Sequence, residues 1–280
     1  MKIFKEIESL RTYLKQIRQP AGLIGFVPTM GALHAGHLAL IAASHQECNY
    51  TVCSIYVNPT QFNNPADLAK YPNTLDQDIA MLEQAGCDVL FCPTHTEMYP
   101  HPDHIRFDFG LLDKTLEGEF RPGHFSGVAL VVSKLLNIVR PDKAYFGQKD
   151  FQQYLIVSKL VADLNFNVQL RCMPIVREPD GLAMSSRNTR LTSAQRKRAL
   201  VFYQSLQQAR ARLHAGVAFE VVKAEVKSIC ENQPEIKLEY LALADTANLS
   251  LLKNVTTQSI LLIAGYVGEV RLIDNLILTE

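Results

Sequence analysis

Two histidines with two residues between them stand where a strand-like run gives way to a helical pattern. Residues 26–37 read FVPTMGALHAGH, so Gly31 and Gly36 lie close to His34 and His37. The first amides of a helix and its dipole favour anions, and glycine lets a phosphate approach the backbone closely. The segment therefore predicts a phosphate site toward which both histidines project. The same spacing is also typical of histidines that only cap or pack a helix.

A lysine occupies a second junction of this kind, in residues 146–153, which read FGQKDFQQ. The Lys149 ammonium can offset the negative charge that develops on an α-phosphate, and Gly147 lets the backbone approach a nucleotide. Asp150 has two interpretations, contact with a ribose or the N-cap of the next helix. Residues 184–187 (MSSR) add two hydroxyls and a guanidinium that suit a triphosphate, although Ser-Ser-Arg in isolation indicates a surface turn.

Strands and helices alternate around these segments through the first two thirds of the chain. Short β-rich runs predict strands at 23–27, 50–57, 88–91, 144–146 and 167–173. Apolar residues at three- and four-residue spacing predict helices at 37–46, 74–85, 127–139 and 151–164. Repeated β–α units of this kind form an α/β fold with a doubly wound, Rossmann-like parallel sheet, in which ligands bind at the carboxyl ends of the strands.

The composition changes after about Arg177. Helical patterns at 193–214 and 219–232 are followed by strand-like runs at 238–244, 260–264 and 268–273. This order predicts a smaller C-terminal α+β domain. We place the boundary at residue 176, with a nucleotide-binding domain over 1–176 and a lid domain over 177–280.

Composition and charge exclude several classes of protein. The 280 residues include 28 Lys and Arg against 28 Asp and Glu, so no net field favours nucleic acid or an anionic membrane. The N-terminus lacks the apolar stretch of a secretion signal, and no apolar run approaches the roughly 18 residues of a membrane span. We therefore expect a cytoplasmic protein. Its six cysteines show no C-x-x-C pair, so we expect reduced core residues rather than disulfides or a zinc site.

Residues 34–37 resemble the His-x-Gly-His element of a nucleotidyltransferase superfamily, which acts on the α-phosphate of a nucleotide. Five segments together, in the family's order, resemble the pantothenate synthetase (pantoate–β-alanine ligase) family. They are 28–37 (PTMGALHAGH), 57–62 (VNPTQF), 121–128 (RPGHFSGV), 146–153 (FGQKDFQQ) and 184–188 (MSSRN).

The resemblance implies that ATP is contacted from three parts of the chain. The implied positions are Met30, Gly31, Ala32, Leu33, His34, Ala35, Gly36, His37, Gly147, Gln148, Lys149, Asp150, Val176, Met184, Ser185, Ser186 and Arg187. His37 stands at the position of the proton donor. The further catalytic residues are His34, Lys149 and Arg187.

The substrate positions that the resemblance implies are two glutamines in the first domain. Gln61 and Gln153 stand where the family contacts pantoate, and Gln61 also lies near the β-alanine site. A neutral amide both donates and accepts hydrogen bonds, which suits a substrate that carries hydroxyls. Arg121 and His124 lie in a glycine-containing loop for which contact with the site and a structural role are both open.

Residues 71–78 (YPNTLDQD) align with a family stretch whose carboxylates lie near Mg²⁺–ATP, and Asp78 is the metal candidate. The alternative is that Thr74 caps the next helix and that Asp76 and Asp78 complement its dipole. The chain departs from the family at Ala35, where a polar or acidic residue is common, and at Asn73, where arginine is frequent. These departures weaken the local ATP and metal assignments without removing a group that the chemistry needs.

The implied reaction activates a carboxylate, because it is a poor acceptor for an amine until its oxygen becomes a better leaving group. Pantoate attacks the α-phosphorus of ATP, Mg²⁺–pyrophosphate leaves, and β-alanine then displaces AMP from pantoyl adenylate to give pantothenate. The resemblance also implies a homodimer, whereas nothing in the sequence indicates a nucleic-acid or membrane partner.

Three rival classes share part of this pattern. An adenylyltransferase would use the same histidines but leave AMP on its product. A tRNA-charging enzyme needs a basic surface and an anticodon-binding domain, for which the chain has neither the charge nor the length. A catalytically silent nucleotide-binding regulator would bind ATP without turnover, and the presence of all the implied catalytic residues argues against it.

Overall fold

The computed structural model describes residues 1–18 and 22–278 and contains two compact units. One unit consists of Met1–Gly147 with Gln153–Pro174, and the other consists of Gln148–Gln152 with Ile175–Glu280. The second unit therefore includes a short segment from the middle of the chain. None of the helices in the described ranges combines the length and apolar content needed to cross a membrane.

The first unit is built on a six-stranded sheet in which all neighbouring strands are parallel. The order is β1-β4-β3-β2-β5-β6, which confirms the predicted doubly wound sheet. The order reverses direction between β2 and β5, so this is the switch point where such sheets bind ligands. The strands are β1 Lys2–Phe4, β2 Ile24–Thr29, β3 Tyr50–Ile55, β4 Val89–Phe91, β5 Lys143–Gly147 and β6 Gln169–Met173.

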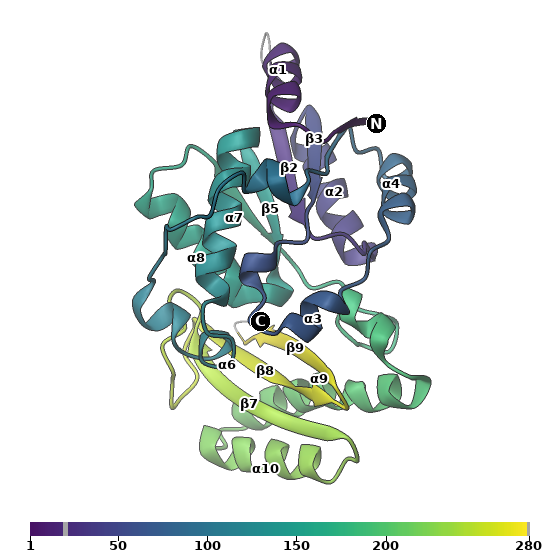
Figure 1. Cartoon of the computed structure of the whole chain (residues 1–280). Coiled ribbons are helices and arrows are strands. Elements are labelled where there is room, and N and C mark those ends of the chain that lie inside the picture. The colour runs from purple at the N-terminus through teal and green to yellow at the C-terminus, as the bar shows by residue number, and fades with distance from the viewer. Residues whose placement is uncertain (19–21, 279–280) are drawn as a thin grey trace. The chain divides into compact units, whose positions relative to one another are not determined.

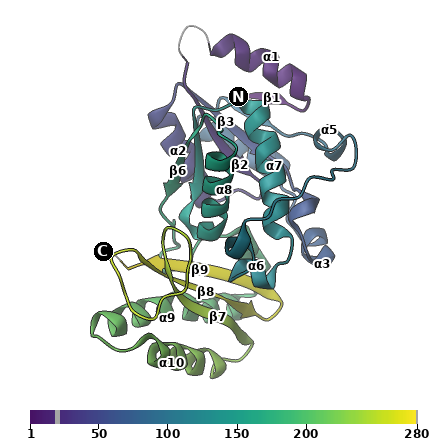
Figure 2. The same ribbon diagram turned by 90° about the vertical axis from the view of Figure 1, so that its left-hand side faces the viewer.

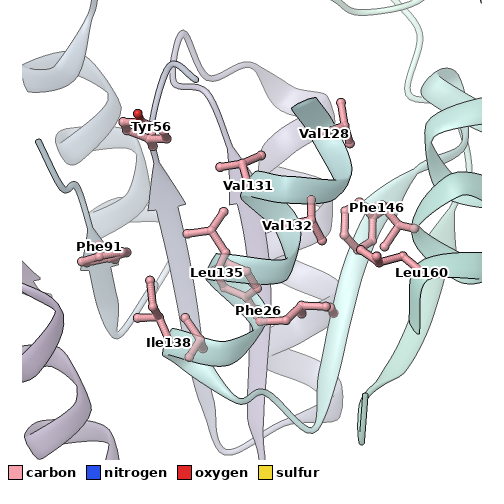
Figure 3. Packing of buried hydrophobic residues seen from close by; sticks show 14 of the residues in the cluster. Phe26, Tyr56, Phe91, Val128, Val131, Val132, Leu135, Ile138, Phe146 and Leu160 are labelled. Atoms are coloured by element: carbon pink, nitrogen blue, oxygen red, sulfur yellow. The ribbon is translucent and has the colours of Figure 1, made fainter. Parts of the chain in front are cut away.

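Helices cover both faces of this sheet (Figure 1). Successive strand residues point to opposite faces, and they divide the core into two layers. Phe26 and Val52 pack with α1, α7 and α8, whereas Val27 and Cys53 pack with α2 and α4. Figure 3 shows the first layer, in which one side of α7 lies on the strands. These helices are α1 Ile7–Ile17, α2 Ala35–Glu47, α4 Leu75–Gln84, α7 His124–Val139 and α8 Phe151–Asp163.

Short elements fill the connections before and after β4. The segment between β3 and α4 contains the 3₁₀ turn η1 Pro59–Gln61 and the helix α3 Pro65–Ala69. The segment between β4 and α7 contains α5 His95–Met98, the 3₁₀ turn η2 Gly110–Asp113 and α6 Glu117–Phe120. These connections carry two of the five motifs.

The second unit is a three-stranded antiparallel sheet, in the order β7-β8-β9, with two helices along one face (Figure 2). This arrangement confirms the predicted α+β class. Its 3₁₀ turns, η3 and η4, carry the polar segments. The elements are η3 Gln148–Asp150, η4 Ser186–Arg190, α9 Ser193–His214, α10 Phe219–Glu231, β7 Ile236–Asp245, β8 Ser259–Val267 and β9 Val270–Ile277.

Candidate active site

The turn from β2 into α2 has a backbone conformation that few sequences adopt. Gly31 and Ala32 have φ values of 80° and 50°, in the left-handed region. Glycine enters this region freely, but an alanine does so at a cost that its surroundings must offset. Thr29 contributes by accepting a hydrogen bond from the Gly31 amide at 3.2 Å and donating one to the Ser54 carbonyl at 2.8 Å.

Asp78 on α4 holds the same turn. Its Oδ2 accepts from the Ala32 amide at 2.9 Å and its Oδ1 from the Leu33 amide at 2.8 Å. The Thr74 hydroxyl lies directly before α4 but donates to Asp78 at 3.2 Å instead of capping the helix. Asp78 is 2% exposed. A carboxylate with three donors in such a place fixes the backbone between β2 and α2.

His34 is the N-cap of α2, and its Nδ1 accepts a hydrogen bond from the Gly36 amide at 3.2 Å. Neutral imidazole carries one proton, so this bond places the proton on Nε2, from which it can be donated to a phosphate. The ring of His37 lies 4.1 Å from that of His34, centroid to centroid. Capping and phosphate binding are therefore compatible roles for His34.

The same contacts limit which groups at the start of α2 can bind an anion. The amides of Ala32, Leu33 and Gly36 already donate to acceptors within the chain. A phosphate at the start of α2 would consequently be met by imidazole N–H groups and the helix dipole rather than by these three amides.

Gln61 is held in place by one neighbour from its own motif and by neighbours from two other motifs. Asn58 Nδ2 donates to Gln61 Oε1 at 3.3 Å, and Gln61 Nε2 points to the Met30 sulfur at 2.9 Å. The imidazole Nδ1 of His124 hydrogen-bonds to the Gln61 carbonyl at 2.7 Å. The structure thus gives buried His124 a contact with a predicted substrate residue. Gln153, in the first turn of α8, is half-buried.

Asn58 is a residue of this site that the sequence did not single out. Its Nδ2 also donates to the Gly127 carbonyl at 3.3 Å, and its Oδ1 accepts from Thr60 at 3.1 Å and Tyr99 at 3.0 Å. All hydrogen-bonding positions of this buried amide are used. The signal in the sequence was the residue's place within the VNPTQF segment, which gives no indication of its partners.

In the second unit, two predicted ATP residues are paired across a short hairpin. The Met184 amide donates to the Val176 carbonyl at 3.0 Å. Ser185 is the N-cap of η4, and its Oγ accepts from the Arg187 amide at 3.3 Å. Backbone pairing therefore holds Met184, and the Ser185 cap orders the start of η4 directly after it.

Lys149 lies in η3, and its side chain is 17% exposed. Its ammonium is 3.8 Å from the carboxylate of Asp150, which directly precedes α8. A small cavity is lined by Lys149, Ser185 and Asp274, among other residues of the second unit. Burial raises the pKa of Asp274, while the Arg177 guanidinium counteracts that rise.

The first unit also contains a hollow of about 630 Å³, lined by residues that include Thr60, Tyr99, Ile105 and Leu130. Gln61 and the histidines of α2 do not line it. Its size alone therefore does not make it the substrate site.

The fold and these contacts define a class of protein, the doubly wound nucleotide-binding α/β enzymes, with polar segments after both strands of the switch point. A family model described as Pantoate-beta-alanine ligase matches residues 2–277. The chain belongs to the pantoate-beta-alanine ligase family.

Individual relatives agree along the whole length of the chain. The pantothenate synthetase of Thermosipho africanus is 44% identical over 99% of this chain and 100% of its own. The crystal structure of pantothenate synthetase from Thermus thermophilus has 40% identity and a TM-score of 0.93 over 100% of both chains. Pantoate-beta-alanine ligase from Francisella tularensis, complexed with beta-gamma ATP and beta-alanine, has 37% identity and a TM-score of 0.85 over 100% of this chain and 98% of its own.

The activity follows from membership of the family. The chain is a ligase that uses ATP to condense pantoate with β-alanine, forming an amide bond in pantothenate biosynthesis.

Proposed function

We propose that the site residues perform this condensation through pantoyl adenylate, with separate tasks for the α2 turn, the two glutamines and the second unit. The observation that supports it best is the turn from β2 into α2. There Asp78 fixes the backbone, and the His34 cap leaves Nε2 to carry the proton. Such an arrangement can donate to a phosphoryl oxygen without reorganising during the reaction.

In the first step, pantoate attacks the α-phosphorus of ATP and pyrophosphate leaves. His34 and His37 neutralise phosphoryl oxygens from the start of α2, with His37 as proton donor. Lys149 adds a positive charge at the α-phosphate and Arg187 pairs with the leaving phosphates. Lys149 and Ser185 line the same small cavity, so the two polar segments of the second unit lie close together, which supports a shared task.

The remaining ATP contacts that we propose come from other atoms of the same segments, and not from the occupied amides of Ala32, Leu33 and Gly36. Val176 and Met184 are paired by a backbone hydrogen bond at 3.0 Å, so they would form one wall of the nucleotide site. The rest of the set is Met30, Gly31, Ala32, Leu33, Ala35, Gly36, Gly147, Gln148, Asp150, Ser185 and Ser186.

Pantoate is held by Gln61 and Gln153 in this proposal. The contacts of Gln61 with Asn58 and His124 preset its orientation, so little side-chain entropy is lost when the substrate binds. In the second step the amine of β-alanine attacks the acyl carbon beside Gln61, and AMP leaves.

Mg²⁺ enters with ATP in this proposal and offsets charge on the triphosphate when bound. Asp78 was the metal candidate, but its two oxygens already accept three hydrogen bonds within the chain. Asp78 therefore fits poorly as a direct metal ligand, and we place the ion on the phosphates.

We also propose that the enzyme is a homodimer that works in the cytoplasm. The family resemblance supports the dimer. The cytoplasm is supported by the use of ATP and by the six cysteines, all of which are unpaired.

A single-turnover experiment tests the mechanism. Enzyme in excess would be mixed with α-labelled ATP and pantoate, with and without β-alanine, and ATP, adenylate and AMP would be separated. We expect adenylate to accumulate without β-alanine and to be converted into AMP and pantothenate when β-alanine is added. If ATP remained intact in both mixtures, the proposal would be wrong, and a silent regulator or an enzyme for a phosphorylated acceptor would replace it.

Two variants test the assigned roles. Lys149→Ala and His37→Ala should each lower the rate of adenylate formation by about 10²-fold or more while the folded state persists. Pyrophosphate release at the wild-type rate would remove the altered residue from the mechanism. Circular dichroism would establish that each variant is folded.

A further inference from the structure

The last strand of the chain carries two consecutive buried polar residues. Asp274 and Asn275 of β9 are 6% and 1% exposed. Side chains alternate between the two faces of a strand. Leu272 packs in the core with α9 and α10, so Asp274 lies on that face and Asn275 on the opposite one.

Asn275 uses its whole side-chain amide on the segment that contains Lys149. Its Nδ2 donates to the carbonyls of Gln148 at 2.9 Å and Lys149 at 3.0 Å, and its Oδ1 accepts from Gln148 Nε2 at 3.1 Å. The two carbonyls lie on either side of the Lys149 α-carbon. Asn275 consequently fixes the backbone from which the lysine side chain extends.

Asp274 helps to hold Asn275 in the position from which it binds residues 148 and 149. Arg177 donates to both of its oxygens, at 2.7 Å and 2.9 Å, and the Arg177 guanidinium lies 4.0 Å from the ring centre of Tyr203. Asp274 Oδ1 also accepts a hydrogen bond from the backbone N–H of Asn275 at 2.7 Å. The strand position that presents Asn275 is therefore held by a bidentate ion pair, which is the geometrically most specific pairing of a carboxylate.

We propose that Asn275 is a positioning residue that sets the place of Lys149 for adenylate formation. This inference rests on the proposed role of Lys149 at the α-phosphate. In this proposal Asn275 does not touch a substrate. It acts only through the carbonyls of Gln148 and Lys149 and through the side chain of Gln148.

The physical reason is that a charge stabilises a transition state only from the correct position. The Lys149 ammonium stands at the end of four flexible methylene groups, so its mean position depends on the position of the Lys149 backbone. A displacement of about 1 Å can lower the rate of a positioned reaction about 10²-fold. An asparagine can make this attachment because one amide donates twice and accepts once.

Two substitutions separate hydrogen bonding from packing. Asn275→Ala removes the amide, and Asn275→Asp keeps its shape but has no N–H to donate. We expect both to lower the single-turnover rate of adenylate formation about 10- to 100-fold, with little change in the ATP concentration that half-saturates the enzyme. Ser259→Ala is the matched control, because it removes a buried hydroxyl from the neighbouring strand that hydrogen-bonds to Thr256, away from the lysine segment.

A double-mutant cycle gives the decisive readout. If Asn275 acts through Lys149, Asn275→Ala should have almost no further effect on adenylation in a Lys149→Ala background. A rate for Asn275→Ala and Asn275→Asp equal to that of Ser259→Ala would overturn the inference, and so would an undiminished effect in the Lys149→Ala background. Wild-type adenylation by Lys149→Ala alone would instead overturn the proposed role of the lysine.

Discussion

Asp78 shows how one buried carboxylate can hold the turn between β2 and α2. Asp78→Asn would place an N–H group against the Ala32 or Leu33 amide, leaving at least one buried donor without an acceptor. Such a loss costs about 1–3 kcal/mol, and the turn would move toward an ordinary backbone conformation. We therefore expect adenylate formation to fall at least about 10-fold.

The Mg²⁺ dependence of this variant decides between holding the turn and binding a metal. If Asp78 holds the turn, the deficit in the adenylation rate persists at saturating Mg²⁺. If it is a ligand, excess Mg²⁺ restores the rate. Asp76→Asn is the control, because Asp76 is exposed in the same first turn of α4 and loses the same charge.

Cysteine reactivity provides an independent test of how deeply the thiols are buried. Burial raises the pKa of Cys87 to about 12 and that of Cys172 to about 11. The thiolate is the reactive form, so at pH 8 only about one Cys87 in ten thousand is reactive, and its alkylation should accelerate as the pH rises toward the pKa.

Mass spectrometry after iodoacetamide treatment would measure these rates in native protein and in guanidinium chloride. We expect Cys87 and Cys172 to react much faster in the denatured protein. Equal rates in both states would contradict the burial of these thiols.

The types of most candidate residues could be predicted from sequence, but their partners could not. The His34 segment was visible because a strand, two glycines and a helix pattern surround it. Asp78 bonds to amides 45 and 46 positions earlier, and Asn275 to carbonyls 126 and 127 positions earlier. Such pairings depend on tertiary packing, for which a single sequence has no local signal.

Element boundaries were predictable where local signals mark them. The bounds predicted for α9 agree with Ser193–His214, because Thr192 and Gln195 form a capping box that defines its start. α7 begins at His124, three residues before the predicted start, after Gly123 with a φ of 78°. β1 was not predicted, because it is a short edge strand with largely exposed side chains.

The junction between α7 and η1 depends on one glycine. A Cβ at Gly127 would lie 2.2 Å from the Thr60 carbonyl oxygen and 2.8 Å from the Gln61 α-carbon. Alanine favours a helix over glycine by about 1 kcal/mol. Gly127→Ala should nevertheless destabilise the protein by about 1–3 kcal/mol, because backbone atoms must move apart, and it should raise the KM for pantoate about 10-fold by displacing Gln61.

Chemical unfolding and steady-state kinetics would measure both effects. Ser133→Ala, in the same helix, provides the control, because it adds no atom to the interface with η1. Wild-type stability and an unchanged pantoate KM in Gly127→Ala would show that the close approach is unimportant.

We expect two copies of the chain to associate in solution. Ile105 and Leu111 are 61% and 78% exposed, so both apolar side chains are available for contact with a second chain. Sedimentation equilibrium should give twice the chain mass of 31.4 kDa. Ile105→Asp should shift the equilibrium toward the monomer, whereas Leu251→Asp, at 65% exposure, should leave it unchanged. A wild-type mass of one chain would refute the dimer.

An acyl adenylate has to be kept from water while it waits for β-alanine. A mixed anhydride hydrolyses unless its surroundings exclude water, and the polar segment 184–187 belongs to the second unit. Binding of a triphosphate to its hydroxyls and guanidinium should restrict this segment, since charge-assisted hydrogen bonds order the groups that make them. We therefore expect ATP with pantoate, in the absence of β-alanine, to slow tryptic cleavage after Arg187 and Arg190.

Cleavage after the exposed Lys114 should proceed unchanged, which separates local protection from inhibition of the protease. Without any protection between residues 177 and 190, the idea that the second unit acts as a lid would have to be abandoned, although the adenylate mechanism itself would stand.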